Sequence, residues 1–433
     1  MNKNSIKDSG VVYLWNLPSD KVYVELRKDF HKKISSMIKN KAEFCRVSNL
    51  SYSIVKKFIY GIRAISLRDL RKIILTLDKN LLKETEQNIF KIGVKSGGKG
   101  LVNPKLPFNL NSVDGAIIIS SILHDGGIAT TLNPYYFNSD KKIRRKVYNA
   151  MSNVFGDIYS AANPKKERLL FPKIIGIVLV NCIGLKSGNK VVTNLEIPHF
   201  IMDADEIIRG AFLKQAFDDE GCISRNEIYL SLSANVTCIS KMFRKKILKN
   251  KLLKYSSEIF KGDKKLLESF GISINNIVVD QTSFIKDNKL HLRHRWKLCI
   301  TTKKNLEIFF SKINFDIDYK KIRLRKLIEK YTRYEKTKFL PTEALIKTLK
   351  IFCEIEEKYG YLSSPIIKEN FNRSDATICL RLNQFKDMGM LKIVNQNSLN
   401  TKAYIYKTTT NARKIIIDAS KKKIVENYIE VFE

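Results

Sequence analysis

DADEIIRGAFLKQAFDDEGCIS, residues 203–224, is the stretch that decides the expected fold. Its apolar residues recur every three or four positions, which predicts an α-helix. Asp203 and Glu206 have the spacing of a capping box, so the helix is expected to start at Asp203. The helix ends in an acid followed by a glycine, Glu220 and Gly221, and the chain then becomes strand-like.

The residues after this helix alternate in polarity. Three apolar residues starting at Ile228 alternate with Tyr229, Ser231 and Ser233. Because successive side chains of a strand point to opposite faces, this pattern predicts a half-buried strand. Its polar face, which carries Tyr229 and Ser231, is expected to contact a ligand.

A similar phrase, DGAIIISSILHDGGIA, lies earlier in the chain at residues 114–129. This helix is apolar nearly all round, which predicts that it is buried. Small residues interrupt both helices, Ser120 and Ser121 in this one, and small side chains let two helices approach closely. This phrase also ends in an acid and a glycine, Asp125 and Gly126.

Acids at the ends of two packed helices create an electrostatic conflict. The carboxyl end of a helix carries partial negative charge, and Asp125 and Glu220 would also repel each other. Mg²⁺ binds one or two carboxylates together with phosphate oxygens and water, so a shared ion resolves the conflict. Such an ion activates water for phosphodiester cleavage. A plain acid–glycine turn is the alternative for either phrase alone, but the repetition favours a metal site.

The two phrases resemble the paired signature of the LAGLIDADG (DOD-type) homing endonucleases. LKQAFDDEG, from Leu213 to Gly221, is the closer match, and IISSILHDG, from Ile118 to Gly126, keeps the apolar run and the final Asp-Gly. The resemblance covers roughly residues 105–330. It implies an α+β fold of two pseudo-symmetric αββαββ units, with a saddle of strands over the major groove of double-stranded DNA. It also implies Mg²⁺-dependent cleavage of both strands by a monomer, with Asp125 and Glu220 as the metal-binding acids.

Further stretches extend the resemblance, at Gly184–Pro198 and Arg295–Phe315. Basic residues near the metals assist catalysis in some members of the family. Lys190 and Lys297 occupy plausible positions, each on a strand-like stretch of its repeat, and are candidate catalytic residues. A phosphate contact or a solvated charge is the alternative for either lysine.

The first signature departs from the family pattern at two positions. His124 stands before Asp125 where the family has a small residue, and Leu123 replaces an acid that Asp218 retains in the second signature. Neither change removes a metal-binding acid. Neither end of the chain resembles an intein splice junction, so a free-standing enzyme is expected.

The N-terminal segment, residues 1–95, is expected to consist of helices with short breaks and resembles a repressor-type helix-turn-helix domain. Asn49 or Ser51 is expected to cap one helix, Gly61 to supply the turn out of it, and Ser66 to cap the next. The alternative is a helical bundle used for dimerisation. On the helix that Asn49 or Ser51 caps, the polar residues that would face DNA include Ser51, Tyr52, Lys56 and Lys57.

The C-terminal segment, residues 337–433, resembles a winged helix-turn-helix domain. Ser363 or Ser364 is expected to cap a short helix, and Ser374 a longer one that Gly389 ends, before a strand pair and a charged tail. A dimerisation module is the alternative. The residues expected to reach bases or phosphates are Thr377, Arg381 and Gln384 on the longer helix and Lys392 and Lys402 beside the wing.

Composition supports a polyanionic partner. The chain has 433 residues with 78 Lys+Arg against 43 Asp+Glu, a net charge of +35. Such an excess indicates nucleic-acid binding, with a merely basic soluble protein as the alternative. Its seven cysteines form no C-x-x-C pair, which argues against a zinc ribbon or a secreted disulfide scaffold. No signal peptide or membrane-spanning run is visible, so a cytoplasmic protein is expected.

Three domains are therefore expected. A helix-turn-helix domain (1–95) and a two-repeat endonuclease domain (96–336) are joined by a linker with Gly97 and Gly98, and a winged-helix domain (337–433) follows. The expected function is site-specific DNA cleavage, with no small-molecule substrate and no membrane partner. A catalytically silent LAGLIDADG-derived transcription regulator is the alternative. RNA binding fits the charge but not two modules built for the major groove.

Overall fold

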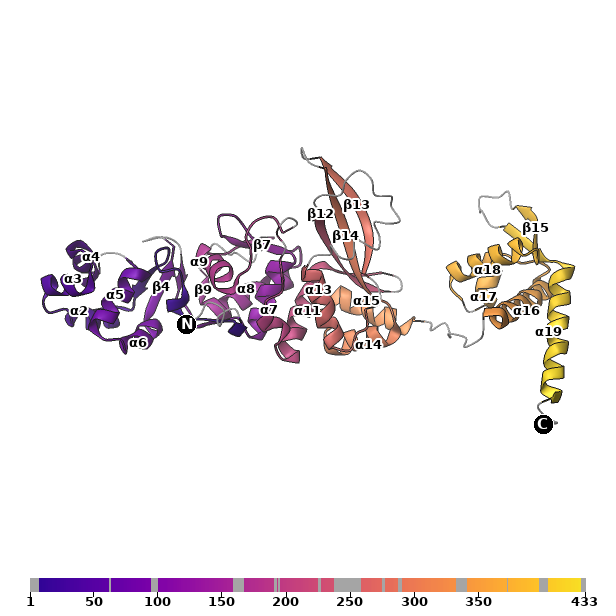
Figure 1. Ribbon diagram of the computed structural model, residues 1–433, viewed down its shortest axis with the longest axis horizontal. Coiled ribbons are helices and arrows are strands. Elements are labelled where there is room, and N and C mark those ends of the chain that lie inside the picture. Colours follow the sequence, from indigo (N-terminus) through magenta and orange to yellow (C-terminus); the bar gives the residue numbers. More distant parts are fainter. Residues whose placement is uncertain are drawn as a thin grey trace. The chain divides into compact units, whose positions relative to one another are not determined.

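The structure is a computed structural model that describes residues 8–61, 64–94, 100–158, 167–190, 193, 195–224, 227–236, 258–274, 277–286, 290–331, 341–371, 373–396 and 404–429. The chain divides into two compact units, Met1–Tyr331 and Thr332–Glu433. The linker residues Gly97 and Gly98 and the wing residue Lys402 lie outside the described residues. Together the units have a mixed α+β structure (Figure 1).

The first unit begins with helices packed beside a sheet. The helices are α2 (Lys28–Ser36), α3 (Lys41–Ser48), α4 (Tyr52–Ile59), α5 (Leu67–Leu77) and α6 (Leu81–Gln87). The sheet has the order β3-β2-β4-β5-β9. Its strands are β2 (Tyr23–Leu26), β3 (Ile65–Ser66), β4 (Ile89–Gly93), β5 (Leu101–Val102) and β9 (Asp157–Ile158). A short ladder of β1 (Val11–Val12) and β6 (Phe108–Asn109) and a turn of helix η1 (Leu14–Asn16) complete this part.

The expectation that the N-terminal segment is all-α was therefore wrong. The strands β2 and β4 pair with each other, and β4 pairs with β5, which lies beyond residue 95. Such pairing depends on distant partners, so local hydrophobic periodicity did not reveal it. The helix caps, by contrast, are confirmed. Ser51 Oγ accepts from the Ile54 amide (3.4 Å), and Ser66 Oγ accepts from the Asp69 amide (3.1 Å).

Two consecutive segments of the first unit repeat one order of elements. The first segment contains α7 (Val113–Leu123), β7 (Gly126–Ile128), β8 (Pro134–Phe137), α8 (Lys141–Phe155), β10 (Arg168–Leu170), α9 (Lys173–Ile177) and the π-helical turn η2 (Val178–Ile183). The second contains α11 (Glu206–Glu220), β11 (Gly221–Ile223), β12 (Ile228–Val236), α13 (Glu258–Ser269), β13 (Ile277–Lys286), β14 (Leu290–Ile300) and α14 (Lys303–Lys312). The helix α10 (His199–Met202) precedes the second segment, and α15 (Asp318–Glu329) follows it.

The two segments also match in strand pairing. The first sheet has the order β7-β8-β10, and the second has the order β11-β12-β14-β13. In the first, Gly126 lies opposite Tyr136, and in the second, Gly221 lies opposite Leu230. Each glycine directly follows a signature acid. The structure thus contains an internal repeat, although the strand after α8 in the first segment, β9, pairs with β5 of the N-terminal sheet.

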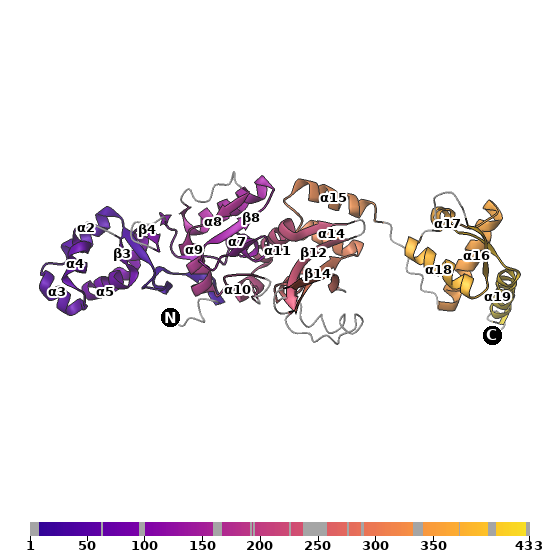
Figure 2. The same cartoon turned by 90° about the horizontal axis from the view of Figure 1, so that it is seen from above.

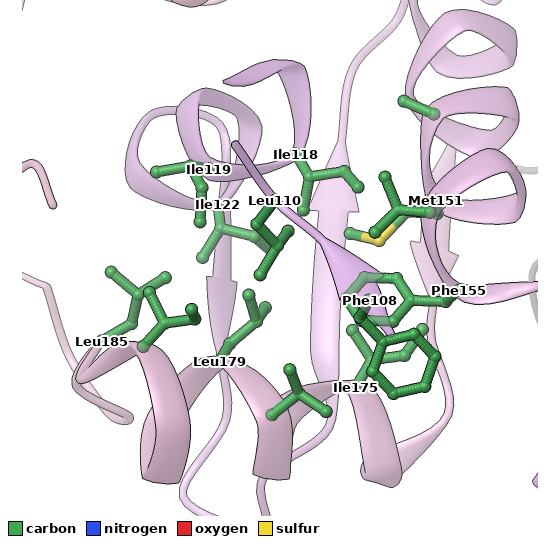
Figure 3. Packing of buried hydrophobic residues seen from close by; sticks show 14 of the residues in the cluster. Phe108, Leu110, Ile118, Ile119, Ile122, Met151, Phe155, Ile175, Leu179 and Leu185 are labelled. Carbon is green, nitrogen blue, oxygen red and sulfur yellow. The ribbon is translucent and has the colours of Figure 1, made fainter. Parts of the chain in front are cut away.

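The two signature helices form the centre of this repeat. α7 and α11 pack against each other, as the view from above shows (Figure 2). Every residue of α7 from Gly115 to Leu123 is buried, as its all-round apolar pattern predicted. Ile118, Ile119 and Ile122 lie in one cluster with Met151 of α8 and Leu179 of η2 (Figure 3).

The start of α11 differs from the expectation. Asp205, not Asp203, is the N-cap, and its side chain accepts from the Ile208 amide at 2.8 Å. Asp203 instead closes the preceding helix α10, because its amide donates to the His199 carbonyl. The capping-box spacing of Asp203 and Glu206 was therefore coincidental.

The second unit has a small core of its own around Phe352, Leu382 and Phe385. Its helices are α16 (Pro341–Tyr359), α17 (Ser364–Asn370), α18 (Asp375–Asp387) and α19 (Thr410–Ile429). The strands β15 (Leu391–Gln396) and β16 (Tyr404–Thr408) pair antiparallel. Ser374 caps α18, as predicted, but the segment expected as a charged tail is the helix α19. No helix among the described residues is long and apolar enough to cross a membrane.

Candidate functional site

The two signature acids lie where α7 and α11 end. Ser120 of α7 ties the helices together, since its hydroxyl donates to the Phe212 carbonyl of α11 at 2.8 Å. Glycine follows each acid because the backbone is too crowded for a side chain. A Cβ at Gly126 would lie 2.5 Å from the Tyr135 carbonyl oxygen, and one at Gly221 would meet the Phe217 carbonyl oxygen.

Asp125 and Glu220 are close enough to influence each other. Both carboxyl groups are half-buried, and burial raises the pKa of each. The charge of Asp125 raises the pKa of Glu220 further. The effect of Asp125 on the pKa of Glu220 has the sign that repulsion between the two acids requires.

A lysine lies at the end of each signature helix. Lys190 Nζ donates to the carbonyls of Leu123 (3.3 Å) and His124 at the end of α7. Lys320 Nζ donates to the carbonyls of Phe217 (3.0 Å) and Asp218 (2.6 Å) at the end of α11. Positive charge is favourable at a helix carboxyl end.

Both lysines are linked electrostatically to the acids. Burial lowers the pKa of Lys190, and the charges of Glu220 and Asp125 oppose that shift. Burial also lowers the pKa of Lys320, and nearby acids including Asp218 and Asp125 oppose it. In turn, both lysines lower the pKa of Asp125. The two helix ends therefore carry an acid and a lysine each.

Sequence reasoning found Lys190 and missed Lys320. Lys190 lies in a turn and not on a strand, in the segment after η2, and Lys320 lies on α15 in the segment after α14. A lysine a few residues after the closing helix of each repeat is the sequence signal that would have pointed to Lys320. Lys297, the other sequence candidate, lies on β14 with its Nζ 4.4 Å from the centre of the Tyr229 ring.

The sheet faces carry matching cation–aromatic pairs. Lys297 lies over Tyr229 in the second sheet, and the Arg168 guanidinium lies 5.0 Å from the centre of the Tyr135 ring in the first. When the two sheets are aligned on the glycine that follows each signature acid, Tyr135 of the first sheet corresponds to Tyr229 of the second. Ser231 is buried and accepts from Arg295 Nε at 2.6 Å, so its hydroxyl is engaged. Arg295, which the sequence did not single out, lowers the pKa of Glu220.

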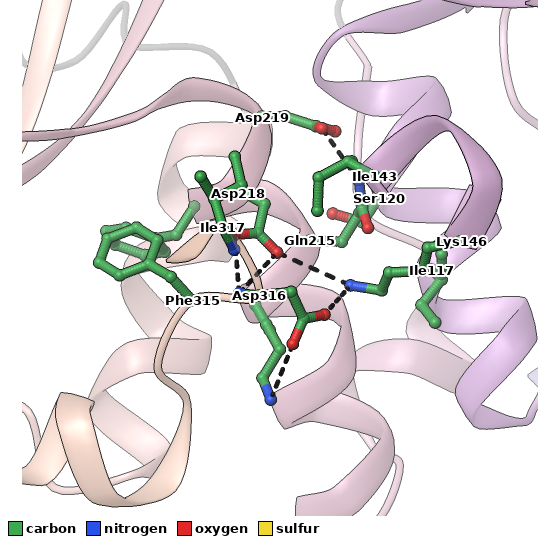
Figure 4. A network of polar contacts seen from close by, with 12 residues as sticks. Ile117, Ser120, Ile143, Lys146, Gln215, Asp218, Asp219, Phe315, Asp316 and Ile317 are labelled. Atoms are coloured by element: carbon green, nitrogen blue, oxygen red, sulfur yellow. Dashed lines mark hydrogen bonds and ion pairs between the residues drawn. The ribbon is translucent and has the colours of Figure 1, made fainter. Parts of the chain in front are cut away.

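An ion network flanks the end of α11 (Figure 4). Asp218, 1% exposed, accepts from the amides of Asp316 (3.0 Å) and Ile317 (3.3 Å), just before α15. Lys146 of α8 lies 3.7 Å from Asp218 and 2.7 Å from Asp316, so it joins the two repeats. Burial raises the pKa of Asp218 to about 6 despite Lys146.

The acids suit a hard divalent cation in their chemistry. Asp125 and Glu220 supply two carboxylates, as many as Mg²⁺ takes from a protein when phosphate and water complete its shell. Among the described residues, no cluster of three or more His, Cys, Asp or Glu side chains is arranged to hold a metal ion. A metal here would therefore depend on these two acids and on ligands from outside the protein.

The candidate DNA contacts of the N-terminal segment are exposed. Ser51, the N-cap of α4, is exposed, as are Tyr52, Lys56 and Lys57 on the outer face of the helix, while Val55 and Phe58 on its other face are buried. In the second unit, Lys392 is exposed. Thr377, Arg381 and Gln384 are half-buried, and Arg381 Nη1 donates to Gln384 Oε1 at 2.7 Å. Their contact with DNA stays a prediction.

The comparisons with known proteins show limited similarity. No family model matches the chain. The ribonucleoside-diphosphate reductase NrdEB subunit alpha of Bacillus subtilis (strain 168) and that of Bacillus phage SPbeta are 25% identical over 146 residues. The match covers 30% of this chain and 13% of each reductase subunit. A crystal structure of the N-terminal LAGLIDADG domain of DUF199/WhiA aligns with 53% of this chain and 88% of its own, at 14% identity and a TM-score of 0.21. A TM-score of this size does not establish a common fold.

Proposed function

We propose that this chain is a LAGLIDADG-type site-specific DNA endonuclease that acts as a monomer and makes Mg²⁺-dependent double-strand breaks. The observation that carries the proposal is the pairing of two repeated segments around α7 and α11. This pairing brings one acid and one lysine to each helix end, Asp125 with Lys190 and Glu220 with Lys320. Two equivalent sets of groups match the two strands of a duplex.

Each group has a chemical role in this proposal. Asp125 and Glu220 would hold Mg²⁺, which would supply an activated water and stabilise the leaving oxygen. Lys190 and Lys320 hold positive charge at the two helix ends, where it stabilises the negative charge that grows on the phosphate. Because these ammonium groups are largely buried, their field is screened less than that of surface lysines.

The sheets and the flanking helices supply DNA contacts in this proposal. Tyr229, Lys297 and Arg168 lie on sheet faces, where aromatic and basic side chains contact bases and phosphates. The exposed lysines of α4 and the exposed Lys392 of the second unit add binding through linked sites. The net charge of +35 supports a polyanionic partner.

The second candidate is a catalytically silent DNA-binding regulator. A specific observation favours it, because Lys190 and Lys320 already offset the charge of the acids. Because the two ammonium groups offset the negative charge of the carboxylates, the folded protein does not need a bound metal to hold these acids together. The two candidates share DNA binding and differ in cleavage.

The test starts from DNA sites selected by the purified full-length chain from a randomised duplex library. Selected duplexes are incubated with Mg²⁺ or Mn²⁺, and the products are separated on a denaturing gel. The endonuclease is expected to cut both strands, and Asp125→Asn or Glu220→Gln is expected to abolish cutting while binding persists.

Glu206→Gln is the matched control. Glu206 lies on the same helix as Glu220 but at its exposed start, where it pairs with Lys312 at 2.9 Å. This variant is expected to cut like the parent protein. Tight binding of one site without cutting in either metal would contradict the endonuclease and support the regulator. A binding constant insensitive to salt would contradict both.

A further inference from the structure

The residue before each signature acid crosses to the other repeat. Asp219 of the second repeat contacts β8 and the turn after it in the first repeat. His124 of the first repeat contacts α13 in the second repeat. The family pattern that the signatures resemble has a small residue at this position, so neither contact follows from that resemblance.

Asp219 receives its hydrogen bonds on one oxygen. Its Oδ1 accepts from the Tyr136 hydroxyl (2.5 Å), from Gln215 Nε2 (2.9 Å) and from Asn138 Nδ2 (3.4 Å). The same Asn138 amide also donates to Asp125 Oδ2 at 3.1 Å. Asn138 therefore links the metal-binding acid of the first repeat to a side chain of the second.

Asn138 is itself held in place. Its side-chain Oδ1 accepts from the Asp140 amide at 2.9 Å, and its carbonyl accepts from the buried Arg144 Nη1 at 2.7 Å. The side chain is 8% exposed. Its amide thus points at Asp125 from a fixed position and does not depend on solvent.

His124 makes the reciprocal contact. Its ring is 2% exposed, with Nδ1 2.8 Å from the Ser120 carbonyl and Nε2 3.5 Å from Asp263 Oδ2. The two ring nitrogens thus lie between a carbonyl of α7 and a carboxyl group of α13. Asp263 is fully buried on α13, and the Phe212 ring of α11 packs edge-on against the imidazole.

The two contacts are not copies of each other. When the two sheets are aligned on the glycine that follows each signature acid, Leu230 and Leu232 of β12 correspond to Tyr136 of β8 and to Asn138 just after it. The second repeat therefore lacks the donors that hold Asp219. Each repeat contributes different residues to these contacts, so two identical copies of either repeat would not form both of them.

We propose that His124 and Asp219 are positioning residues that fix each signature acid relative to the opposite repeat. They hold the carboxyl groups of Asp125 and Glu220 at a fixed distance from each other, although the two carboxylates at the ends of α7 and α11 repel. This inference rests on the proposed function, and it adds residues that act through the acids and not on the DNA. Asp219 Oδ1 is used by three donors, whereas its Oδ2 is buried without a hydrogen-bond partner among the described residues, so the variants below must separate positioning from metal binding.

The test compares Asp219→Ala with Asp219→Asn in the full-length chain on a selected DNA site. Asparagine keeps the acceptor oxygen that Tyr136, Gln215 and Asn138 need, whereas alanine removes it. We expect D219A to lower kcat roughly 10- to 100-fold, as loss of a residue behind a metal ligand does, with little change in KM. D219N is expected to retain most of the rate. Equal loss in both variants would overturn the positioning role, because only a ligand needs the charge.

His124→Ala tests the reciprocal contact, with Ser121→Ala as the control. Ser121 is buried on the same helix, and its hydroxyl donates only to its own helix at the Ile117 carbonyl (2.7 Å). H124A is expected to lower kcat and raise the Mg²⁺ concentration for half-maximal cleavage, while S121A leaves both unchanged. If H124A and S121A behave alike, the inference is wrong.

A metal-binding measurement separates this inference from the proposed function. Mn²⁺ is titrated into the protein–DNA complex and followed by electron paramagnetic resonance. If the parent chain binds Mn²⁺ without cutting, the endonuclease fails, and weaker Mn²⁺ binding by D219A and H124A still supports the positioning role. If the parent binds no Mn²⁺, both proposals fall. If it cuts and D219A and H124A cut equally well, only the positioning role falls.

Discussion

Replacing Asp218 by asparagine is expected to stabilise the first unit at neutral pH. Burial raises the pKa of this carboxyl from 3.8 to about 6, so the folded chain holds its proton more tightly than the unfolded chain. A shift of about 2 pH units corresponds to about 3 kcal/mol. Wild-type stability therefore includes a penalty that is absent near pH 4, grows as pH rises to about 6, and is complete above it.

Asparagine has the shape of the protonated acid and carries no charge. It can still accept a hydrogen bond from the Asp316 amide. The attraction between Lys146 and the ionised carboxyl already lowers the pKa of Asp218 within its net value of about 6, so the loss of that attraction needs no separate correction. Asp218→Asn is thus expected to be more stable than the parent by up to about 3 kcal/mol at pH 8 and nearly equal at pH 4.

Urea unfolding at a series of pH values measures this difference. Both tryptophans, Trp15 and Trp296, lie in the first unit, so their fluorescence follows that unit alone. The control is Asp318→Asn, which removes an exposed acid paired with Lys142 at 3.2 Å and is expected to change stability little. A D218N variant that is less stable than the parent at pH 8, or a difference that does not change with pH, would refute the reasoning.

Three further outcomes are expected. Lys320→Met should reduce the cleavage rate more than Lys297→Met in single-turnover assays, because Lys320 lies at the helix end beside the acids and Lys297 lies over an aromatic ring. Lys56→Ala should lower the slope of log binding constant against log salt concentration by about 0.9, the contribution of one phosphate contact, while an unchanged slope would place α4 away from DNA. Gly126→Ala should lower the thermal unfolding midpoint, because its Cβ would lie 2.5 Å from a backbone carbonyl oxygen.

The sequence predicted the features that depend on neighbouring residues. Ser51 and Ser66 cap their helices, and α7 is buried all round, because capping and apolar periodicity act within a few residues. The acid–glycine endings also predicted Asp125 and Glu220 as a pair at the ends of two packed helices, and α7 and α11 do pack against each other. The charge of Asp125 raises the pKa of Glu220, and the shared metal site stays a prediction.

Features that depend on distant residues were decided by the tertiary structure. The N-terminal strands exist because β4 pairs with β5 beyond the helical segment, and the start of α11 depends on where α10 ends. Lys320 was one basic residue among many until folding placed its ammonium group at the end of α11. Residue types and short spacings determine helices, caps and turns, whereas strand partners and the few charges that meet in the core are chosen by packing between segments far apart in the chain.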